Sequence, residues 1–103
     1  MPRPRICRRI EAKPNITYFK PQGVPLRMLE VSKITFDEFE AVRLKDLNGL
    51  EQEECAKKMR ISQPTLHRLL LSARKKIADA IVNGKALSIE GGNFEIKHNK
   101  LKK

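Results

Sequence analysis

The sequence predicts a mainly α protein with three helices, the last two joined as a helix-turn-helix, an irregular amino-terminal arm and a short carboxy-terminal β element. Apolar residues recur at helical spacing from about residue 35 to residue 83. Asn-Gly pairs at positions 48–49 and 83–84 supply two helix stops. We therefore divide the 103-residue chain, which has room for one small core, into an arm (1–33), a helical unit (34–84) and a β segment with a basic tail (85–103).

The arm is basic and rich in proline. Five prolines among its first thirty residues exclude a long helix there. Short extended pieces are expected around residues 6–10 and 16–19, and the second is rich in side chains that favour strands.

The first helix is expected to begin after Thr35. Thr35 and Glu38 have the spacing of a capping box, in which each side chain satisfies a free backbone N–H. We interpret Asp37, Glu38 and Glu40 as cap and helix-surface residues rather than as catalytic carboxylates. The expected apolar face consists of Phe36, Phe39, Ala41, Val42, Leu44 and Leu47.

The second helix is expected from about Leu50 to Met59 or Arg60, with acidic residues in its first turn. Ser62 is a natural cap for the third helix, and Pro64 fits its first turn, so this helix should run to Asn83. Arg60 stands where such turns often have Gly, which indicates a differently built turn. The apolar positions that fit two steeply crossing helices are Cys55, Ala56, Met59, Ile61, Leu66 and Leu69.

The segment after Gly84 alternates apolar and polar residues on either side of Gly91-Gly92. Two arrangements fit this pattern: a short hairpin, or a strand that pairs with the extended piece at residues 6–10. The Ile77/Ile81 face, with Phe94 and Ile96, can pack within one subunit or between two, so the oligomeric state stays open.

Several motifs together resemble a small prokaryotic family of uncharacterised, predicted DNA-binding proteins, whose helix-turn-helix is similar to region four of the bacterial sigma-70 factors. The resemblance implies a winged-helix-like or sigma region-four-like fold and DNA binding. The matching pieces are Arg3-Pro-Arg with Cys7-Arg-Arg, Phe19–Pro25, Asp37–Asp46, Gly49–Glu54, Ala73–Lys76 and Gly84–Gly92.

The charge also favours a nucleic-acid partner. The formal net charge is +10, and the excess lies in residues 1–30 and 61–103, whereas residues 31–60 are nearly neutral. The start of the third helix offers Ser62, Gln63, Thr65, His67 and Arg68 to a DNA major groove. We expect Arg68 to contact a guanine, with a phosphate contact or an intramolecular ion pair as the alternatives. We expect Gln63 to contact an adenine, and Lys75 and Lys76 to lie on the phosphate backbone.

A second contact is expected from the arm, because short arginine segments can lie in a narrow minor groove. The alternatives are a solvated end for Arg3 and Arg5, and the polar side of a strand for Arg8 and Arg9.

The sequence therefore predicts a sequence-specific double-stranded DNA-binding protein that regulates transcription, with a homodimer on two-fold sites as one possible arrangement. The alternative is a protein-interaction module that contacts the transcription machinery and binds DNA weakly or non-specifically. We expect no enzyme, no cofactor and no metal site, and for Cys7 either a redox role or a small buried side chain. The chain has no apolar run of membrane-spanning length, no secretory signal and only two cysteines, which favours a cytoplasmic protein.

Overall fold

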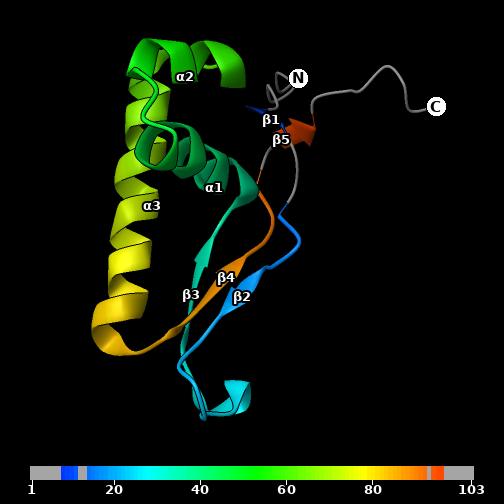
Figure 1. The fold of residues 1–103 in the computed structure, drawn as a ribbon, viewed down its shortest axis with the longest axis vertical. Coiled ribbons are helices and arrows are strands. Elements are labelled where there is room, and N and C mark those ends of the chain that lie inside the picture. Colours follow the sequence, from blue (N-terminus) through cyan, green and yellow to red (C-terminus); the bar gives the residue numbers. More distant parts are fainter. Residues whose placement is uncertain (1–7, 12–13, 93, 97–103) are drawn as a thin grey trace, which may run out of the picture.

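The computed structural model describes residues 8–11, 14–92 and 94–96, and it is mainly α with a small three-stranded sheet (Figure 1). The helices are α1 (Phe36–Val42), its π-helical continuation η2 (Arg43–Leu47), α2 (Gln52–Met59) and α3 (Gln63–Asn83), with a 3-10 turn, η1 (Leu26–Met28). The strands are β1 (Arg8–Ile10), β2 (Tyr18–Phe19), β3 (Val31–Ile34), β4 (Ala86–Ile89) and β5 (Phe94–Ile96).

The two strands after α3 do not form a hairpin. β4 is the centre of the sheet β2-β4-β3, antiparallel to β2 and parallel to β3, whereas β5 pairs in parallel with β1. The pairing with the extended piece near residues 6–10 is thus confirmed for β5, and the hairpin alternative is wrong. Gly91 and Gly92 instead carry the chain past the start of α1, where the Phe36 N–H donates to the Gly91 carbonyl at 3.0 Å.

Gly92 is required at this crossing. Its φ is +99°, and an added Cβ would lie 2.6 Å from Thr35 Cβ. A side chain at this position would therefore push the connection between β4 and β5 away from α1.

The amino-terminal segment is part of the fold rather than a separate arm. β3, which the sequence analysis did not predict, pairs with β4, and the Ser32 hydroxyl donates to the Lys76 carbonyl of α3 at 2.9 Å. Its residues alternate exposed and buried, which is the pattern of a half-buried strand. Four residues among prolines and charges are too few for this alternation to be distinctive in sequence.

The capping box at Thr35 and Glu38 is confirmed, but the expected apolar face of the first helix changes direction at its end. After Val42 the chain takes a π-helical turn, which adds a residue and rotates those that follow. Leu44 is consequently buried, whereas Leu47 is 78% exposed.

The interpretation of Asp37, Glu38 and Glu40 as surface residues is wrong, because all three are buried. Glu38 accepts hydrogen bonds from the Thr35 N–H at 2.9 Å, the Ser72 hydroxyl at 2.5 Å and the Lys76 amino group at 3.1 Å. Glu40 accepts from Arg43 Nε and Nη2 at 2.9 Å, so both carboxylates have the partners that buried charges need.

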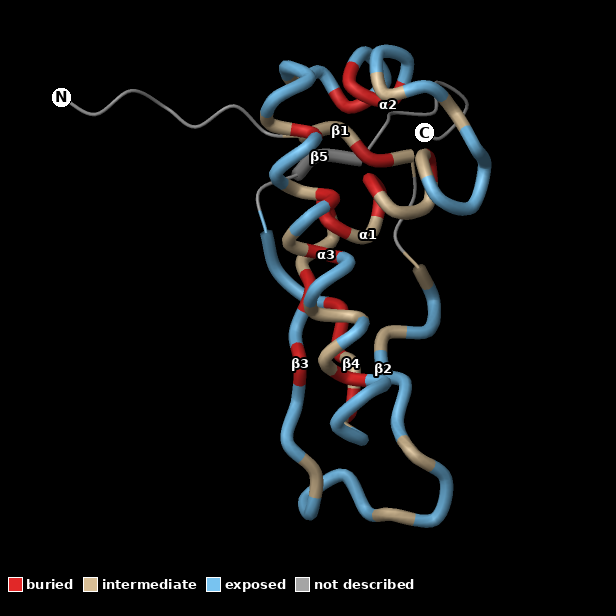
Figure 2. Tube along the Cα trace, turned by 90° about the vertical axis from the view of Figure 1, so that its left-hand side faces the viewer, coloured by how far each residue is buried: buried red, intermediate tan, exposed pale blue. Residues whose placement is uncertain are grey.

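The main core lies where α1, η2, α2 and the first half of α3 meet, and Figure 2 shows buried segments gathered there. Every apolar position predicted for the helix crossing belongs to this core or packs against it. The fully buried members are Ala41, Leu44, Cys55, Ala56, Met59, Leu66 and Leu70, and the partly buried ones are Val42, Leu50, Ile61 and Leu69.

Candidate nucleic-acid interface

A tight turn joins α2 to α3 and sets the direction of α3. Arg60 has φ 59° and ψ 46°, the left-handed conformation, its N–H donates to the Lys57 carbonyl, and the Ile61 N–H donates to the Ala56 carbonyl. This is the Schellman arrangement that usually contains Gly. The expectation of a differently built turn is therefore wrong: the turn is the usual one, and Arg60 adopts the strained conformation itself.

The first turn of α3 is capped as predicted. The Ser62 hydroxyl accepts from the Thr65 N–H at 3.2 Å and donates to Thr65 Oγ1 at 2.9 Å, and Pro64 lies in the first turn. Arg68 Nη2 donates to Thr65 Oγ1 at 3.4 Å, which holds the guanidinium along the helix surface. The hydroxyls of Ser62 and Thr65 thus make hydrogen bonds within the start of α3.

Gln63, His67 and Arg68 are exposed at the start of α3, and Lys75 is exposed two turns after Arg68. All four predicted contact residues are thus open to solvent on α3, with His67 one turn after Gln63 and Lys75 two turns after Arg68. Figure 1 shows α2 lying across this end of the long helix, and the core holds α2 and α3 together beneath it.

Some neighbouring cations are engaged within the protein. Arg74 makes a bidentate pair with Asp46, with Nε–Oδ2 at 3.0 Å and Nη2–Oδ1 at 2.6 Å, and this pairing lowers the pKa of Asp46. The amino group of Lys76 is held by buried Glu38. Of Lys75 and Lys76, both expected on the phosphate backbone, Lys76 is thus paired within the protein, whereas Lys75 makes no ion pair among the described residues.

Two further cations were missed as contact candidates. Lys57 and Arg60 are exposed, and neither makes an ion pair with another described residue. Lys57 lies in the last turn of α2, and Arg60 lies in the turn that leads into α3. Their positive charge directly before the cap residue was the available signal, but Arg60 was considered for its backbone alone.

The amino-terminal end of α2 has the opposite charge. Glu51, Glu53 and Glu54 are exposed there. They complement the positive end of the α2 dipole and would repel a phosphate backbone. A polyanion can therefore approach the turn and the start of α3 but not the start of α2.

The arginines of the amino-terminal segment divide into two groups. Arg8 is no longer a candidate for DNA contact, because its Nε lies 3.7 Å from Asp37 Oδ2 and its side chain is 24% exposed. Arg9 is half-buried on β1, in agreement with the alternative that placed it on a strand. Arg3, Arg5 and Cys7 lie outside the described residues.

Other chemistry at this site is limited. Burial raises the pKa of the Cys55 thiol, which lies in the core and is therefore unsuited to nucleophilic work. Within residues 8–11, 14–92 and 94–96, no three His, Cys, Asp or Glu side chains gather as a metal site. In the same part of the chain, no helix has both the length and the apolar character needed to cross a bilayer.

Comparison with known proteins identifies relatives along almost the whole chain. The family described as "Protein of unknown function DUF134" matches residues 1–97. A UPF0251 protein of Thermoanaerobacter pseudethanolicus is 57% identical over 96 residues, which cover 93% of this chain and 81% of the relative. A UPF0251 protein of Caldanaerobacter subterraneus subsp. tengcongensis is 59% identical with the same coverage, and one of Dehalococcoides mccartyi is 59% identical with 82% of the relative covered. No solved structure matches the chain.

Proposed function

We propose that this protein, which belongs to the DUF134 family, binds double-stranded DNA sequence-specifically and regulates transcription. The observation that carries the proposal is the exposed start of α3, a helix capped by Ser62 that projects from a packed helix pair. In a helix-turn-helix protein this is the part of the second helix that enters the major groove.

The side chains at this helix start suit recognition of base edges. Arg68 has the fork geometry that contacts guanine O6 and N7, and Gln63 has an amide that can contact adenine N6 and N7. Both are exposed, and among the described residues the Arg68 side chain makes a single hydrogen bond, a long one of 3.4 Å to the hydroxyl of Thr65. His67 is also exposed and lies about one turn after Gln63 on α3.

The surrounding charges suit the phosphate backbone. Lys57 and Arg60 before the start of α3, and Lys75 further along α3, are exposed cations with no ion-pair partner among the described residues. Arg43, Arg74, Lys76 and Lys85, in contrast, are paired with carboxylates. Unpaired charge therefore lies where a groove-bound helix would have phosphates beside it.

The test is selection of bound duplexes from a random-sequence DNA library at near-physiological salt. We expect one short motif to be enriched, with a guanine and an adenine whose preference depends on Arg68 and Gln63. Binding without enrichment of any motif would contradict base recognition and would favour a protein-interaction module of the transcription machinery.

A further inference from the structure

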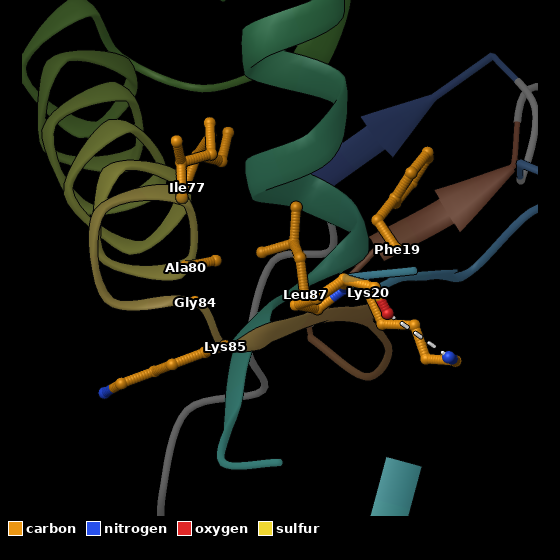
Figure 3. A pocket seen from close by; sticks show the side chains of 9 residues that line it. Phe19, Lys20, Ile77, Ala80, Gly84, Lys85 and Leu87 are labelled. Carbon is orange, nitrogen blue, oxygen red and sulfur yellow. Dashed lines mark hydrogen bonds between the residues drawn. The ribbon is translucent and has the colours of Figure 1, made fainter. Parts of the chain in front are cut away.

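The three-stranded sheet is only partly covered by helix. α3 packs on β3 and β4 but leaves β2 at its margin. Between β2 and the last turns of α3 lies a groove of about 340 Å³. In Figure 3, Ile77 and Ala80 of α3 lie opposite Leu87 of β4. The apolar lining of the groove consists of Phe19, Pro21, Ile77, Ala80, Ile81 and Leu87.

The border of the groove is itself apolar and exposed. Phe19 is 54% exposed and Ile81 76%, and Val82 beside it is 78% exposed. Of the ten large exposed hydrophobic side chains among the described residues, only Leu47 and Leu71 lie away from the sheet, its loop and the end of α3. Apolar side chains gathered in this way on a soluble domain mark an interaction surface.

Charge distinguishes this end of the molecule from the start of α3. Residues 18–34 and 79–90 together contain four cations and three anions. Their net charge is therefore small beside the formal net charge of +10 of the whole chain. The Lys20 amino group donates to the Val24 carbonyl, and that of Lys85 pairs with Asp79 and Glu30. With a net charge of +1 over these two segments, this end of the molecule attracts a polyanion and repels another basic chain only weakly.

We propose that a second copy of this chain covers the groove, in a two-fold dimer in which Ile81 of each subunit enters the groove of the other. The exposed Ile81 side chain and the groove lie at the same end of one chain, which is what a self-complementary two-fold contact requires. Positions 97–103, which follow the described residues, contain one apolar residue, Leu101, and so offer little to fill the groove.

This dimer extends the proposed function, on which its DNA-binding consequence rests. Ile81 follows Arg68 by 13 residues of α3, about 20 Å along the helix, so the interface lies well away from the recognition residues. Two subunits can therefore join at this end and each leave its helix start free for one half-site of a two-fold DNA sequence.

Sedimentation equilibrium on the full chain without DNA tests the interface. We expect the mass of two 11.9 kDa chains for the unmodified protein. Ile81→Glu and, from the other side of the groove, Phe19→Glu should each weaken self-association at least roughly 100-fold. Leu47→Glu is the matched control, because Leu47 is equally exposed but lies away from the sheet, and this variant should stay dimeric. Circular dichroism verifies that each variant is folded.

A protein that is monomeric up to about 100 µM overturns the proposal, as does an Ile81→Glu variant that folds and remains dimeric. Equal weakening by Leu47→Glu would also overturn it, since that result places the contact elsewhere. On DNA, Ile81→Glu should retain half-site affinity and lose at least roughly tenfold on a two-fold site. A protein that dimerises but selects no DNA sequence would contradict the proposed function and would still support the proposed dimer interface.

Discussion

Arg60 has two properties that are seldom found together. Its φ of 59° is the left-handed conformation, which costs a residue with a Cβ about 1 kcal/mol or more. Its side chain is exposed and makes no ion pair within the described residues, so no charge pairing of the side chain compensates for the strain. Strained residues cluster at functional sites, and the proposed phosphate contact beside the start of α3 is a function that the Arg60 side chain can have.

Arg60→Gly should therefore stabilise the protein and weaken DNA binding. Release of the strain, less the greater freedom of Gly in the unfolded chain, should raise the free energy of unfolding by roughly 0.5–1 kcal/mol. Loss of one phosphate contact should lower affinity roughly three- to tenfold at near-physiological salt. Urea denaturation and fluorescence anisotropy measure the two effects.

Arg60→Lys is the control, because it keeps both the charge and the strain. It should retain most of the DNA affinity and gain no stability. If Arg60→Gly binds DNA as well as the unmodified protein, the phosphate contact is wrong, and if it is less stable, the strain argument is wrong.

Arg68 is the second residue whose role can be measured alone. Arg68→Ala should cost roughly 1–3 kcal/mol in binding to the selected site and should relax the preference at one base. Arg27→Ala removes the same charge from an exposed position at the sheet end and should change neither quantity. Equal losses for the two variants would mean that net charge, not base recognition, determines affinity.

At the scale of elements, Glu38 joins the start of α1 to the middle of α3. Burial raises the pKa of this carboxyl, but hydrogen bonds from Ser72, the Thr35 N–H and Lys76 outweigh burial and hold the pKa below its ordinary value. A lowered pKa means that the ionised form stabilises the fold. α1 and α3 are thus joined by charge as well as by the core.

This linkage predicts a pH dependence. Because the folded pKa of Glu38 is lowered, its contribution is complete above the unfolded value of about 4.5 and is lost as the pH falls through the folded value. Glu38→Gln should lower the free energy of unfolding by about 1–2 kcal/mol at pH 7. The difference from the unmodified protein should shrink as the pH falls below about 4.5.

Urea denaturation at several pH values between 3 and 7 measures this difference, with Glu53→Gln as the control at an exposed carboxylate of α2. A difference for Glu38→Gln that does not change with pH would show that the carboxyl contributes through packing and not through its charge.

The strands show where element-level prediction ends. Alternation around Gly91-Gly92 correctly indicated extended chain, but it could not select the partners. β4 pairs with β2 and β3, and β5 pairs with β1, all of which precede α1 in the chain. Gly92 packs against Thr35 and directs β5 away from β4. Such a partner is chosen by contacts between distant residues, which a local pattern does not contain.

At the scale of the whole molecule, the unpaired cations proposed to contact DNA lie from the end of α2 to just past the middle of α3, whereas exposed apolar side chains lie near the end of α3. Lys57, Arg60, Arg68 and Lys75 surround or follow its start, whereas Phe19, Ile81 and Val82 lie near its end. Separate ends allow one helix to bind DNA and another subunit at the same time.

The salt dependence of DNA binding should reflect this separation. A plot of log affinity against log salt concentration should be linear, and Lys75→Ala should reduce its slope by about 0.9. Arg27→Ala should leave the slope unchanged, because Arg27 lies at the sheet end. Equal slope changes for both variants would show that phosphate contacts are spread over the whole surface.

The sequence alone determined the local features: the cap at Thr35, the cap at Ser62, the helix stop at Gly84 and the apolar positions of the helix crossing. These depend on residues within a few positions of one another. Only the tertiary structure decided that Arg8 and Lys76 are paired with buried carboxylates, that Arg60 adopts the strained turn, and that β4 and β5 pair with the amino-terminal segment. The physical reason is that burial and ion pairing depend on which distant residues meet in space, and this is settled only when the whole chain packs.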